Sequence, residues 1–187
     1  MKKIIFSVLI ITVFCVFSLA AQDASTRAGV ILSHYAAPRD GFATGTIPQA
    51  DLNAIIQAGV RAPSAGNRQP WFFTVVQNLD LARKIVPQTV QGNVIIVIST
   101  EGNSSSQILD CGLATQSIYL AAQALGYGSR IYTGPINNVN NTLKGELGLP
   151  NGRNAVAAVW VGRVSVNTDA VSAASARKSA NETVTYK

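Results

Sequence analysis

The segment from Arg61 to Trp71 concentrates polar side chains that could hold a small ligand. Its sequence is Arg-Ala-Pro-Ser-Ala-Gly-Asn-Arg-Gln-Pro-Trp, which combines hydroxyl, amide and guanidinium groups. Asn and Gln amides can complement adjacent carbonyl and imide groups, so this segment could hold a planar polar heterocycle by its edge. The alternative is a well-packed turn that binds nothing.

Other common chemistries lack the residues that they need. The chain has one histidine, His34, in an irregular segment, and it has no G-x-S-x-G motif, so we do not expect a Ser-His-Asp hydrolase. No cluster of His and Cys has metal-ligand spacing, and we expect no metal site. Cys111 is the single cysteine after residue 20 and lies in an apolar stretch. This position indicates a small core residue and not a redox nucleophile.

The composition indicates one folded domain. The chain has 187 residues, of which 48% are hydrophobic and 13% charged, which excludes a disordered tail or a coiled coil. The formal net charge is +6, but the charges are scattered and no run of Lys or Arg exceeds two. Because nucleic-acid-binding surfaces concentrate their basic residues, we interpret the charge as a solvated surface and expect no nucleic-acid partner.

The N-terminus has the pattern of a signal peptide. Lys2 and Lys3 precede an apolar run from Ile4 to Ala20, which ends in the small residues of a cleavage site, Ser18-Leu19-Ala20. We expect residues 1–20 to be cleaved and residues 21–187 to form a single domain, with no stable membrane insertion afterwards. The predicted location is outside the cytoplasm, in the periplasm. The less favoured alternative is an uncleaved membrane anchor.

Hydrophobic periodicity predicts interleaved helices and strands. A helix is expected to start at Thr46-Ile47-Pro48, with Thr46 as N-cap and Pro48 in its first turn. The many small residues of the longest helix, 106–125, imply close packing against another helix or a subunit partner. The pattern as a whole predicts an α+β fold in three layers. The other predicted elements are strands 71–76, 93–99, 129–133 and 155–164, helices 80–86 and 138–147, and a polar tail, 167–187.

Three segments in order resemble the flavin-dependent nitroreductase family. The loop from Ala62 to Trp71 resembles the family signature A-P-S-x-x-N-x-Q-P-W. Residues 110–134 resemble its long dimer helix and the A-L-G-x-G-S turn that follows. Leu147-Gly148-Leu149-Pro150 with the strand 156–162 is similar to its third motif, and the tail after Ala176 is similar to its basic C-terminal segment. The sequence is thus identified as a short, exported member of this family.

The resemblance implies a fold, a cofactor and a reaction. The fold would be a three-layer α/β/α arrangement with a central mixed sheet, in an intertwined homodimer. FMN would bind in clefts at the subunit interface. The protein would then reduce nitroaromatic, quinone or related small-molecule acceptors in two-electron, ping-pong fashion with NAD(P)H or another donor. Because the flavin carries the hydride, the resemblance implies no catalytic side chain.

The resemblance also implies which residues bind FMN. The loop residues would contact the isoalloxazine and ribityl groups, and the backbone after the strand 129–133 would approach the ring from the partner side of the cleft. Two basic tail residues would reach the phosphate. These cofactor-binding residues are Pro63, Ser64, Asn67 and Gln69 in the loop, Thr133 and Gly134 after the strand, and Arg177 and Lys178 in the tail.

One segment departs from the family pattern. The family opens with an arginine-rich R-R-S-x-R segment that grips the FMN phosphate, and alignment on Phe42 leaves Ala37 and Asp40 where two arginines would stand. Arg39 is close and could substitute as a phosphate ligand. The departure keeps a second hypothesis open, a non-enzymatic protein that binds flavin or another small ligand on a degenerate nitroreductase scaffold.

Overall fold

The computed structural model describes residues 29, 31, 34–165 and 177–187. The chain divides into two units, residues 1–34 and residues 35–187. The expected signal peptide, residues 1–20, lies outside the described residues, as does the part of the tail from 167 to 176. In the first unit, the Nδ1 atom of His34 lies 2.5 Å from the carbonyl oxygen of Ile31. Within the described residues, no helix is long and apolar enough to cross a membrane.

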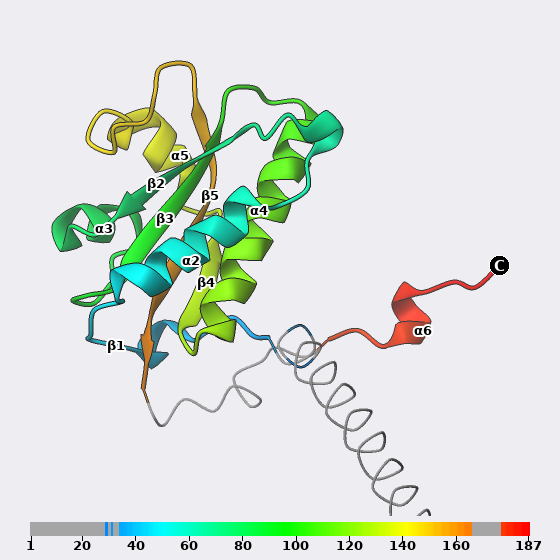
Figure 1. The fold of residues 1–187 in the computed structure, drawn as a ribbon, viewed down its shortest axis with the longest axis horizontal. Helices are drawn as coiled ribbons and strands as arrows, with labels where there is room; N and C mark the ends of the chain where they lie inside the picture. The colour runs from blue at the N-terminus through cyan, green and yellow to red at the C-terminus, as the bar shows by residue number, and fades with distance from the viewer. Residues whose placement is uncertain (1–28, 30, 32–33, 166–176) are drawn as a thin grey trace, which may run out of the picture. The chain divides into compact units, whose positions relative to one another are not determined.

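A five-stranded sheet forms the centre of the second unit (Figure 1). The strand order is β1-β5-β3-β2, and β4 also pairs with β5, on the edge opposite β3. All seven residues of β3 are buried, as predicted for a central strand that is covered on both faces. The strands are β1 (Phe42–Ala43), β2 (Trp71–Val76), β3 (Val94–Thr100), β4 (Gly128–Tyr132) and β5 (Asn154–Val164).

The pairing of the strands corrects one detail of the expected fold. We expected a mixed sheet, but every pairing in the described part of the chain is antiparallel. The reason is the position of β5. Strands β3 and β4 run in the same direction, as a helical crossover requires, but β5 lies between them and runs antiparallel to both.

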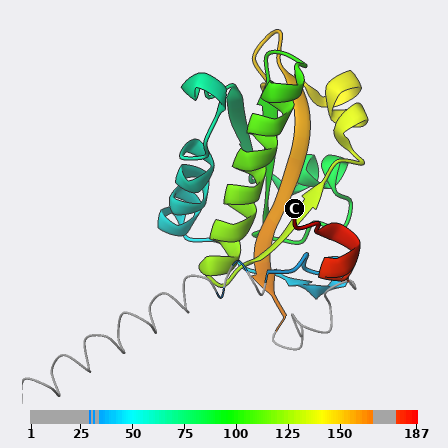
Figure 2. The ribbon, with the colours of Figure 1, turned by 90° about the vertical axis from the view of Figure 1, so that its right-hand side faces the viewer.

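Helices cover both faces of the sheet and produce the predicted three layers (Figures 1 and 2). On one face, α2 (Gln49–Val60) and α4 (Ser105–Ala124) pack on a buried cluster that includes Ile96 and Ile98 of β3. On the other face, α3 (Leu79–Ile85), α5 (Ile136–Asn138) and the following π-helix η3 (Val139–Leu143) cover the neighbours Ile95 and Val97. The alternation of side chains along β3 therefore divides the core into two clusters.

Most predicted elements are confirmed to within two residues, but two helices differ. α2 begins at Gln49 because Pro48 has an extended backbone and its carbonyl oxygen accepts the first helical hydrogen bond, from Leu52. Pro48 is therefore the N-cap, and the prediction of Thr46 is wrong. The predicted helix 138–147 begins two residues earlier, at Ile136, and continues as the π-helix η3 to Leu143. There the Asn140 amide hydrogen-bonds both backbone groups of Ala155, at 3.0 and 2.8 Å.

The polar tail contains a helix that the hydrophobic pattern did not indicate. α6 (Ala180–Thr183) begins with a capping box, in which the Ser179 N–H donates to the Glu182 carboxylate at 2.8 Å. This hydrogen bond and the one from the Ser179 hydroxyl lower the pKa of Glu182. The S-x-x-E pattern was the local signal that could have predicted this helix.

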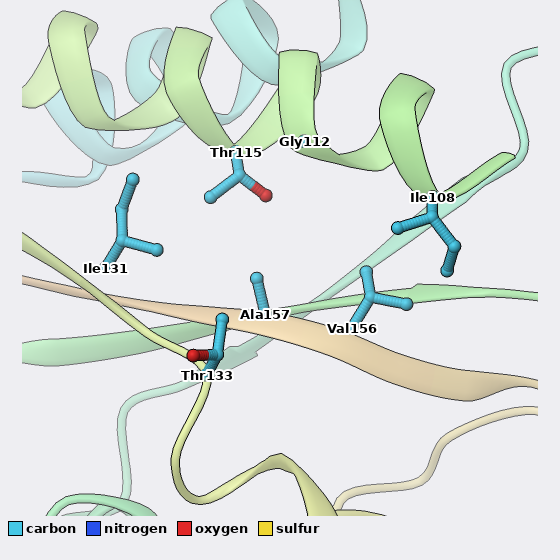
Figure 3. Close-up of a pocket in the computed structure, with 7 residues that line it drawn as sticks. All are labelled: Ile108, Gly112, Thr115, Ile131, Thr133, Val156 and Ala157. Carbon is cyan, nitrogen blue, oxygen red and sulfur yellow. The ribbon is translucent and has the colours of Figure 1, made fainter. Parts of the chain in front are cut away.

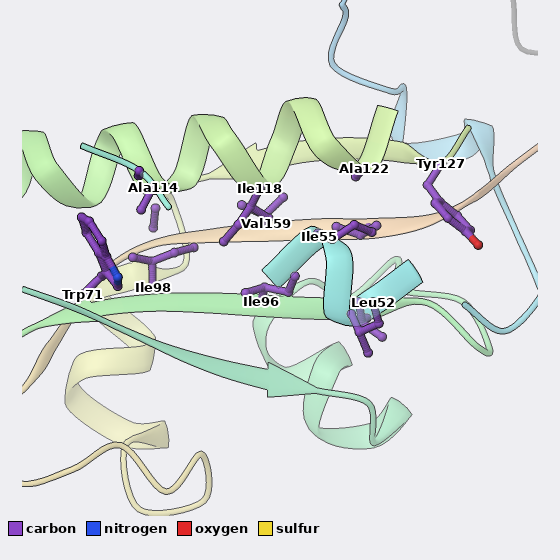
Figure 4. Close-up of a cluster of buried hydrophobic side chains, with 14 of the residues drawn as sticks. Leu52, Ile55, Trp71, Ile96, Ile98, Ala114, Ile118, Ala122, Tyr127 and Val159 are labelled. Atoms are coloured by element: carbon purple, nitrogen blue, oxygen red, sulfur yellow. The ribbon is translucent and has the colours of Figure 1, made fainter. Parts of the chain in front are cut away.

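Helices α2 and α4 pack against each other through buried side chains that include Ile55 and Ile118 (Figure 4), and α2 has a glycine, Gly59, where Ile118 approaches it. A Cβ atom added at Gly59 would lie 2.7 Å from Cγ1 of Ile118 on α4, which is too short for a carbon–carbon contact. On the α4 side, Ala114 and Ala122 are fully buried. The small residues therefore allow close packing against another helix, one of the two predicted alternatives. This packing also places the loop that follows α2.

We predict that Gly59→Ala destabilises the fold, because the added methyl group must displace Ile118 or move α2. Overpacking of this kind costs roughly 1–3 kcal/mol of unfolding free energy. Denaturant-induced unfolding measures the change. The matched control is Gly145→Ala, since a Cβ at Gly145 would have no neighbour within 4 Å. Equal unfolding free energies for the two variants would contradict the packing argument.

Candidate functional site

The loop between α2 and β2 folds around Ser64. The Ser64 hydroxyl oxygen accepts a hydrogen bond from the backbone N–H of Gln69 at 3.0 Å, and its carbonyl oxygen accepts one from the N–H of Asn67 at 3.0 Å. The Gln69 amide Nε2 donates to Oδ1 of Asn67 at 3.1 Å. The loop thus satisfies several of its own backbone donors, as the turn hypothesis expected. The exposed Asn67 Nδ2 has no partner among the described residues, and it could donate to a ligand.

The backbone of this loop is strained at the residues expected to bind a ligand. Gly66, Asn67 and Gln69 have φ angles of 60°, 54° and 48°. Among the described residues, Asn67 and Gln69 are the non-glycine residues with positive φ. Left-handed conformations cost a non-glycine residue about 1–2 kcal/mol, and such strain concentrates at ligand-binding sites. The loop is therefore held in one shape by its surroundings.

Two buried or partly buried charged side chains hold the loop at its ends. Near the start of the loop, the backbone N–H of Ala65 donates to Oδ1 of Asp110 on α4 at 3.0 Å, and Asp110 is only 4% exposed. At the other end, Arg153 Nη1 donates to the carbonyl oxygen of Pro70 at 2.9 Å. Arg153 also forms an ion pair with Glu101 at 2.8 Å. These contacts fix the strained segment between two points of the scaffold.

A cavity of about 270 Å³ lies between α4 and the strands β4 and β5 (Figure 3). Apolar side chains form most of its wall, and the hydroxyl groups of Thr115 and Thr133 are its polar side-chain groups. Thr133, a predicted site residue, follows β4 directly. A flat, largely apolar ring system would suit such a wall. The lining residues are Ile108, Gly112, Thr115, Ile131, Thr133, Val156 and Ala157.

Two glycines near this cavity leave open space, among the described residues, where a side chain would stand. An added Cβ at Gly134, directly after Thr133, would meet nothing within 4 Å, and the same holds at Gly112 on α4. Gly134 and Gly112 are exposed, and neither has a positive φ. A glycine inside a helix costs about 1 kcal/mol relative to alanine. Close approach of a ligand or a second protein surface would account for the missing side chains.

Within one chain, the loop and the cavity lie on different sides of α4. Asp110 contacts the loop, whereas Ile108 and Gly112 line the cavity. Residues two positions apart point about 200° apart around an α-helix. The structure thus brings Ser64, Asn67 and Gln69 together with the exposed Pro63, and it places Thr133 and Gly134 together elsewhere. It does not unite the two groups in a single chain.

The predicted basic residues lie apart from the loop. The Arg39 guanidinium lies 5.8 Å from the centre of the Tyr132 ring, beside the end of β4. Arg177 and Lys178 are exposed and precede α6. Burial raises the pKa of Tyr119, and the hydrogen bond from Gln123 lowers it. The positive charges of Arg177 and Arg130 also lower this pKa, so both arginines act on Tyr119 of α4 and not on the loop. Because side chains alternate along a strand, Arg39 lies with Tyr132 on the face of β4 opposite to Ile131 and Thr133.

Other chemistry is limited in the described residues. Cys111 is fully buried, as predicted for a core residue, and burial raises the pKa of its thiol. Because the thiolate is the reactive form, burial and the raised pKa both disfavour reaction at this thiol. No group of three or more His, Cys, Asp and Glu side chains in the described segments could hold a metal ion.

Sequence reasoning missed the residues that hold the loop. Asp110 and Arg153 are far from the loop in the sequence, and neither belongs to a motif that predicts the contact. A weak signal was available, since Asp110 is the one carboxylate within an otherwise apolar or small stretch of α4, Ile108 to Ala114. A buried carboxylate needs a hydrogen-bond donor, but the sequence alone could not identify it.

The sequence matches the model of the Nitroreductase family over residues 38–94 and 87–163. These matches span more than half of the 187 residues, and the chain belongs to the nitroreductase family. A protein of Archaeoglobus fulgidus named NADH dehydrogenase/NAD(P)H nitroreductase is 33% identical over 117 residues, 56% of this chain and 67% of that protein. A protein of Methanothermobacter thermautotrophicus with the same name is 32% identical over 98 residues, 47% of this chain but 51% of that protein. The match thus spans about half of the second relative.

Solved structures show the same fold. A nitroreductase with bound FMN from Desulfitobacterium hafniense has a TM-score of 0.71 and 21% identity, covering 87% of this chain and 98% of that chain. A nitroreductase in complex with FMN from Desulfovibrio desulfuricans has a TM-score of 0.71 and 23% identity. This similarity covers 86% of this chain and 95% of that chain. The expected nitroreductase-like α+β fold is confirmed.

We predict that Asp110→Ala loosens the loop. The substitution leaves the Ala65 N–H without its acceptor, so the free energy that protects this amide should fall by roughly 1–3 kcal/mol. Hydrogen exchange of the Ala65 amide measures the change directly. Asp110→Asn keeps an acceptor oxygen and should retain most of the protection. Unchanged exchange in Asp110→Ala would show that the carboxylate does not hold the loop.

Proposed function

We propose that the protein is an FMN-dependent oxidoreductase that works as a homodimer. It reduces nitroaromatic, quinone or related acceptors by two electrons in a ping-pong reaction, with NAD(P)H or another donor as reductant. The observation that carries the proposal is the strained loop, whose polar side chains Asn67 and Gln69 are exposed on a nitroreductase fold. The printed names of the relatives and the FMN of the solved neighbours support the same chemistry.

The residues present fit FMN. The cavity beside β4 offers an apolar wall for a flat ring, and Gly134 leaves space for a group to approach the backbone. The loop offers amide groups for the polar edge of the ring, with Asn67 Nδ2 as a donor. Flavin sites need both kinds of surface, since the ring system is apolar on its faces and polar along one edge.

A second copy of the chain would complete the site. Helix α4 exposes apolar side chains on the side away from its own core, with Ile108, Leu109 and Leu113 being 42%, 63% and 37% exposed. Gly112 lies among them and leaves room for close approach. Since one chain places its loop and its cavity on different sides of α4, two copies that pack through this helix would bring one loop to the partner's cavity.

In this proposal the protein binds and positions the reactants, while bound FMN supplies hydride transfer at its N5 atom. Asn67 and Gln69 orient the polar edge of the ring, and Ser64 keeps their backbone in place through its hydrogen bond to the Gln69 N–H. Ile131, Val156 and Ala157 exclude water from the ring face. The buried Asp110 is used to hold the loop, so proton transfer to the acceptor relies on solvent.

The apolar N-terminal segment extends the proposal to the location of the protein. A chain with a signal peptide would act outside the cytoplasm, in the periplasm, after removal of residues 1–20. NAD(P)H is a cytoplasmic reductant. A reductant of the periplasm would then replace it, and the flavin would be acquired after export.

Spectroscopy and sedimentation test the proposal together. We expect the purified protein to take up FMN, to show an oxidised-flavin absorbance spectrum and to sediment as a dimer. Addition of dithionite and then of a quinone under anaerobic conditions should bleach and restore that spectrum. Protein that stays colourless with excess FMN would contradict the proposal. A coloured protein that no acceptor reoxidises would favour flavin binding without turnover.

We predict that Asn67→Gly weakens FMN binding without harm to the fold. The variant loses the amide, whose unsatisfied partner on the ring costs about 1–3 kcal/mol, or roughly one to two orders of magnitude in affinity. Glycine adopts a φ of 54° without strain, which offsets the loss of the exposed hydrogen bond from Gln69 Nε2, so the melting temperature of the apoprotein should change little. Titration of FMN and thermal unfolding of the apoprotein measure the two effects.

Asn67→Ala is the matched comparison for this prediction. It removes the same amide but keeps a Cβ atom in the left-handed conformation, which costs about 1–2 kcal/mol. Both variants should therefore lose FMN affinity equally, and only Asn67→Ala should melt lower. Unchanged FMN affinity in both would show that Asn67 serves only the turn.

A further inference from the structure

The turn before β5 contains an asparagine followed by a glycine. Residues 150–153 are Pro-Asn-Gly-Arg, and Asn151-Gly152 is the one Asn-Gly pair in the sequence. The backbone N–H of Arg153 donates to the carbonyl oxygen of Pro150 at 3.2 Å, which closes the turn. Gly152 has a φ of 81°, a conformation that glycine adopts at no steric cost. Asn151 and Gly152 are both exposed, so solvent reaches the pair.

Both groups that react in the deamidation of an asparagine are available in this turn. The reaction begins when the next backbone nitrogen attacks the side-chain amide carbon, and it makes asparagine a thermolabile residue. In the described part of the chain, neither the Asn151 amide nor the Gly152 N–H has a hydrogen-bond partner. An added Cβ at Gly152 would meet nothing within 4 Å. The attacking nitrogen therefore has neither a side chain of its own residue nor an acceptor to hold it back.

Asn103 provides the contrast within the same protein. It is also exposed, and it precedes Ser104, the N-cap of α4. The Ser104 N–H, which would be the attacking nitrogen, donates to Oε1 of Gln107 at 3.3 Å as part of the capping box. This hydrogen bond must open before the nitrogen can react. The structure therefore favours reaction at Asn151 over reaction at Asn103.

Arg153, the last residue of the turn, fixes the end of the candidate ligand loop. Its side chain is only 15% exposed. Nη1 donates to the carbonyl oxygen of Pro70 at 2.9 Å, and Nη2 donates to Glu101 at 2.8 Å. The centre of the Phe72 ring lies 5.4 Å from its Cζ atom. The guanidinium position thus depends on the backbone of the turn that carries it.

We propose that Asn151 is a deamidation site whose reaction releases Arg153 from the loop. A solvent base removes the Gly152 amide proton, and the nitrogen forms a bond to Cγ of Asn151. The side-chain nitrogen takes up a proton and leaves as ammonia, which gives a five-membered succinimide. Water then opens this ring at either carbonyl group, and the products are aspartate and isoaspartate. The step needs water alone and no change of oxidation state.

Both products disturb the contacts of Arg153. Isoaspartate routes the main chain through the side-chain methylene, so the turn gains one backbone carbon and its hydrogen bond to Pro150 is lost. Either product also adds a negative charge two residues from a guanidinium whose carboxylate partner is Glu101. Because charged acceptors bind a guanidinium more strongly than neutral ones, this charge competes with the carbonyl oxygen of Pro70. The end of the strained loop is then released.

Ageing of the purified protein in mildly alkaline buffer tests the site. Peptide mass spectrometry follows the mass gain that accompanies the replacement of the amide NH2 by OH. We expect Asn151 to convert roughly tenfold faster than Asn103, because the hydrogen bond at Ser104 must first open. The converted protein carries one additional negative charge, so ion-exchange chromatography separates it from the unconverted protein.

Hydrogen exchange of the Gln69 amide measures the release of the loop. This N–H donates to the Ser64 hydroxyl oxygen in the intact protein, and we expect its exchange to be roughly tenfold faster in the converted protein. Asn151→Gln is the matched control, because its longer side chain would have to close a six-membered ring, which is slow. After the same ageing, this variant should keep the exchange rate of fresh protein. Neither measurement needs a flavin.

Two results would overturn the proposal. Conversion of Asn151 no faster than that of Asn103 would show that the turn protects the pair. Conversion without a change in Gln69 exchange would show that Arg153 keeps its hold on Pro70. Fast conversion and faster exchange in the wild-type protein, with neither in Asn151→Gln, support the proposal whether or not the protein binds FMN.

Discussion

The packing of α4 against the sheet and against α2 is the constraint on which the candidate site depends. Within the first three turns, neighbouring residues of this helix enter the core, contact the loop and line the cavity. Cys111 and Ala114 are fully buried, Asp110 accepts the hydrogen bond from Ala65, and Gly112 faces the cavity. One helix therefore positions the start of the loop and one wall of the cavity, and a shift of α4 would move both together.

The loop shows how a fold can maintain a strained segment for a ligand. Positive φ angles at Asn67 and Gln69 are unfavourable in isolation, and they persist because the segment is fixed at both ends. Asp110 holds one end and Arg153 the other. The hydrogen bonds centred on Ser64 keep the backbone donors satisfied without a ligand. A loop of this kind presents its amide groups before the ligand binds, so little conformational entropy is lost on binding.

The cations near β4 illustrate a different kind of arrangement. Here charge is contributed by two segments that are distant in the sequence, the turn at Arg39 and the strand at Arg130. Their common support is the Tyr132 ring, and the burial of Ala37 excludes a basic side chain at that position. Two elements that are distant in the sequence thus bring their guanidinium groups to the same aromatic ring.

The sequence determined most of the secondary structure, the three layers and the family. Hydrophobic periodicity was sufficient for β2, β3, β5 and α4, because buried faces leave a clear pattern in the sequence. The motif from Ala62 to Trp71 identified the loop without a structure. The tertiary structure alone decided that the sheet is antiparallel, that Asp110 and Arg153 hold the loop, and that Arg130 reaches Ala37. These contacts join residues that lie far apart in the sequence, where periodicity and local propensity carry no information, and only the packing of the elements brings their atoms together.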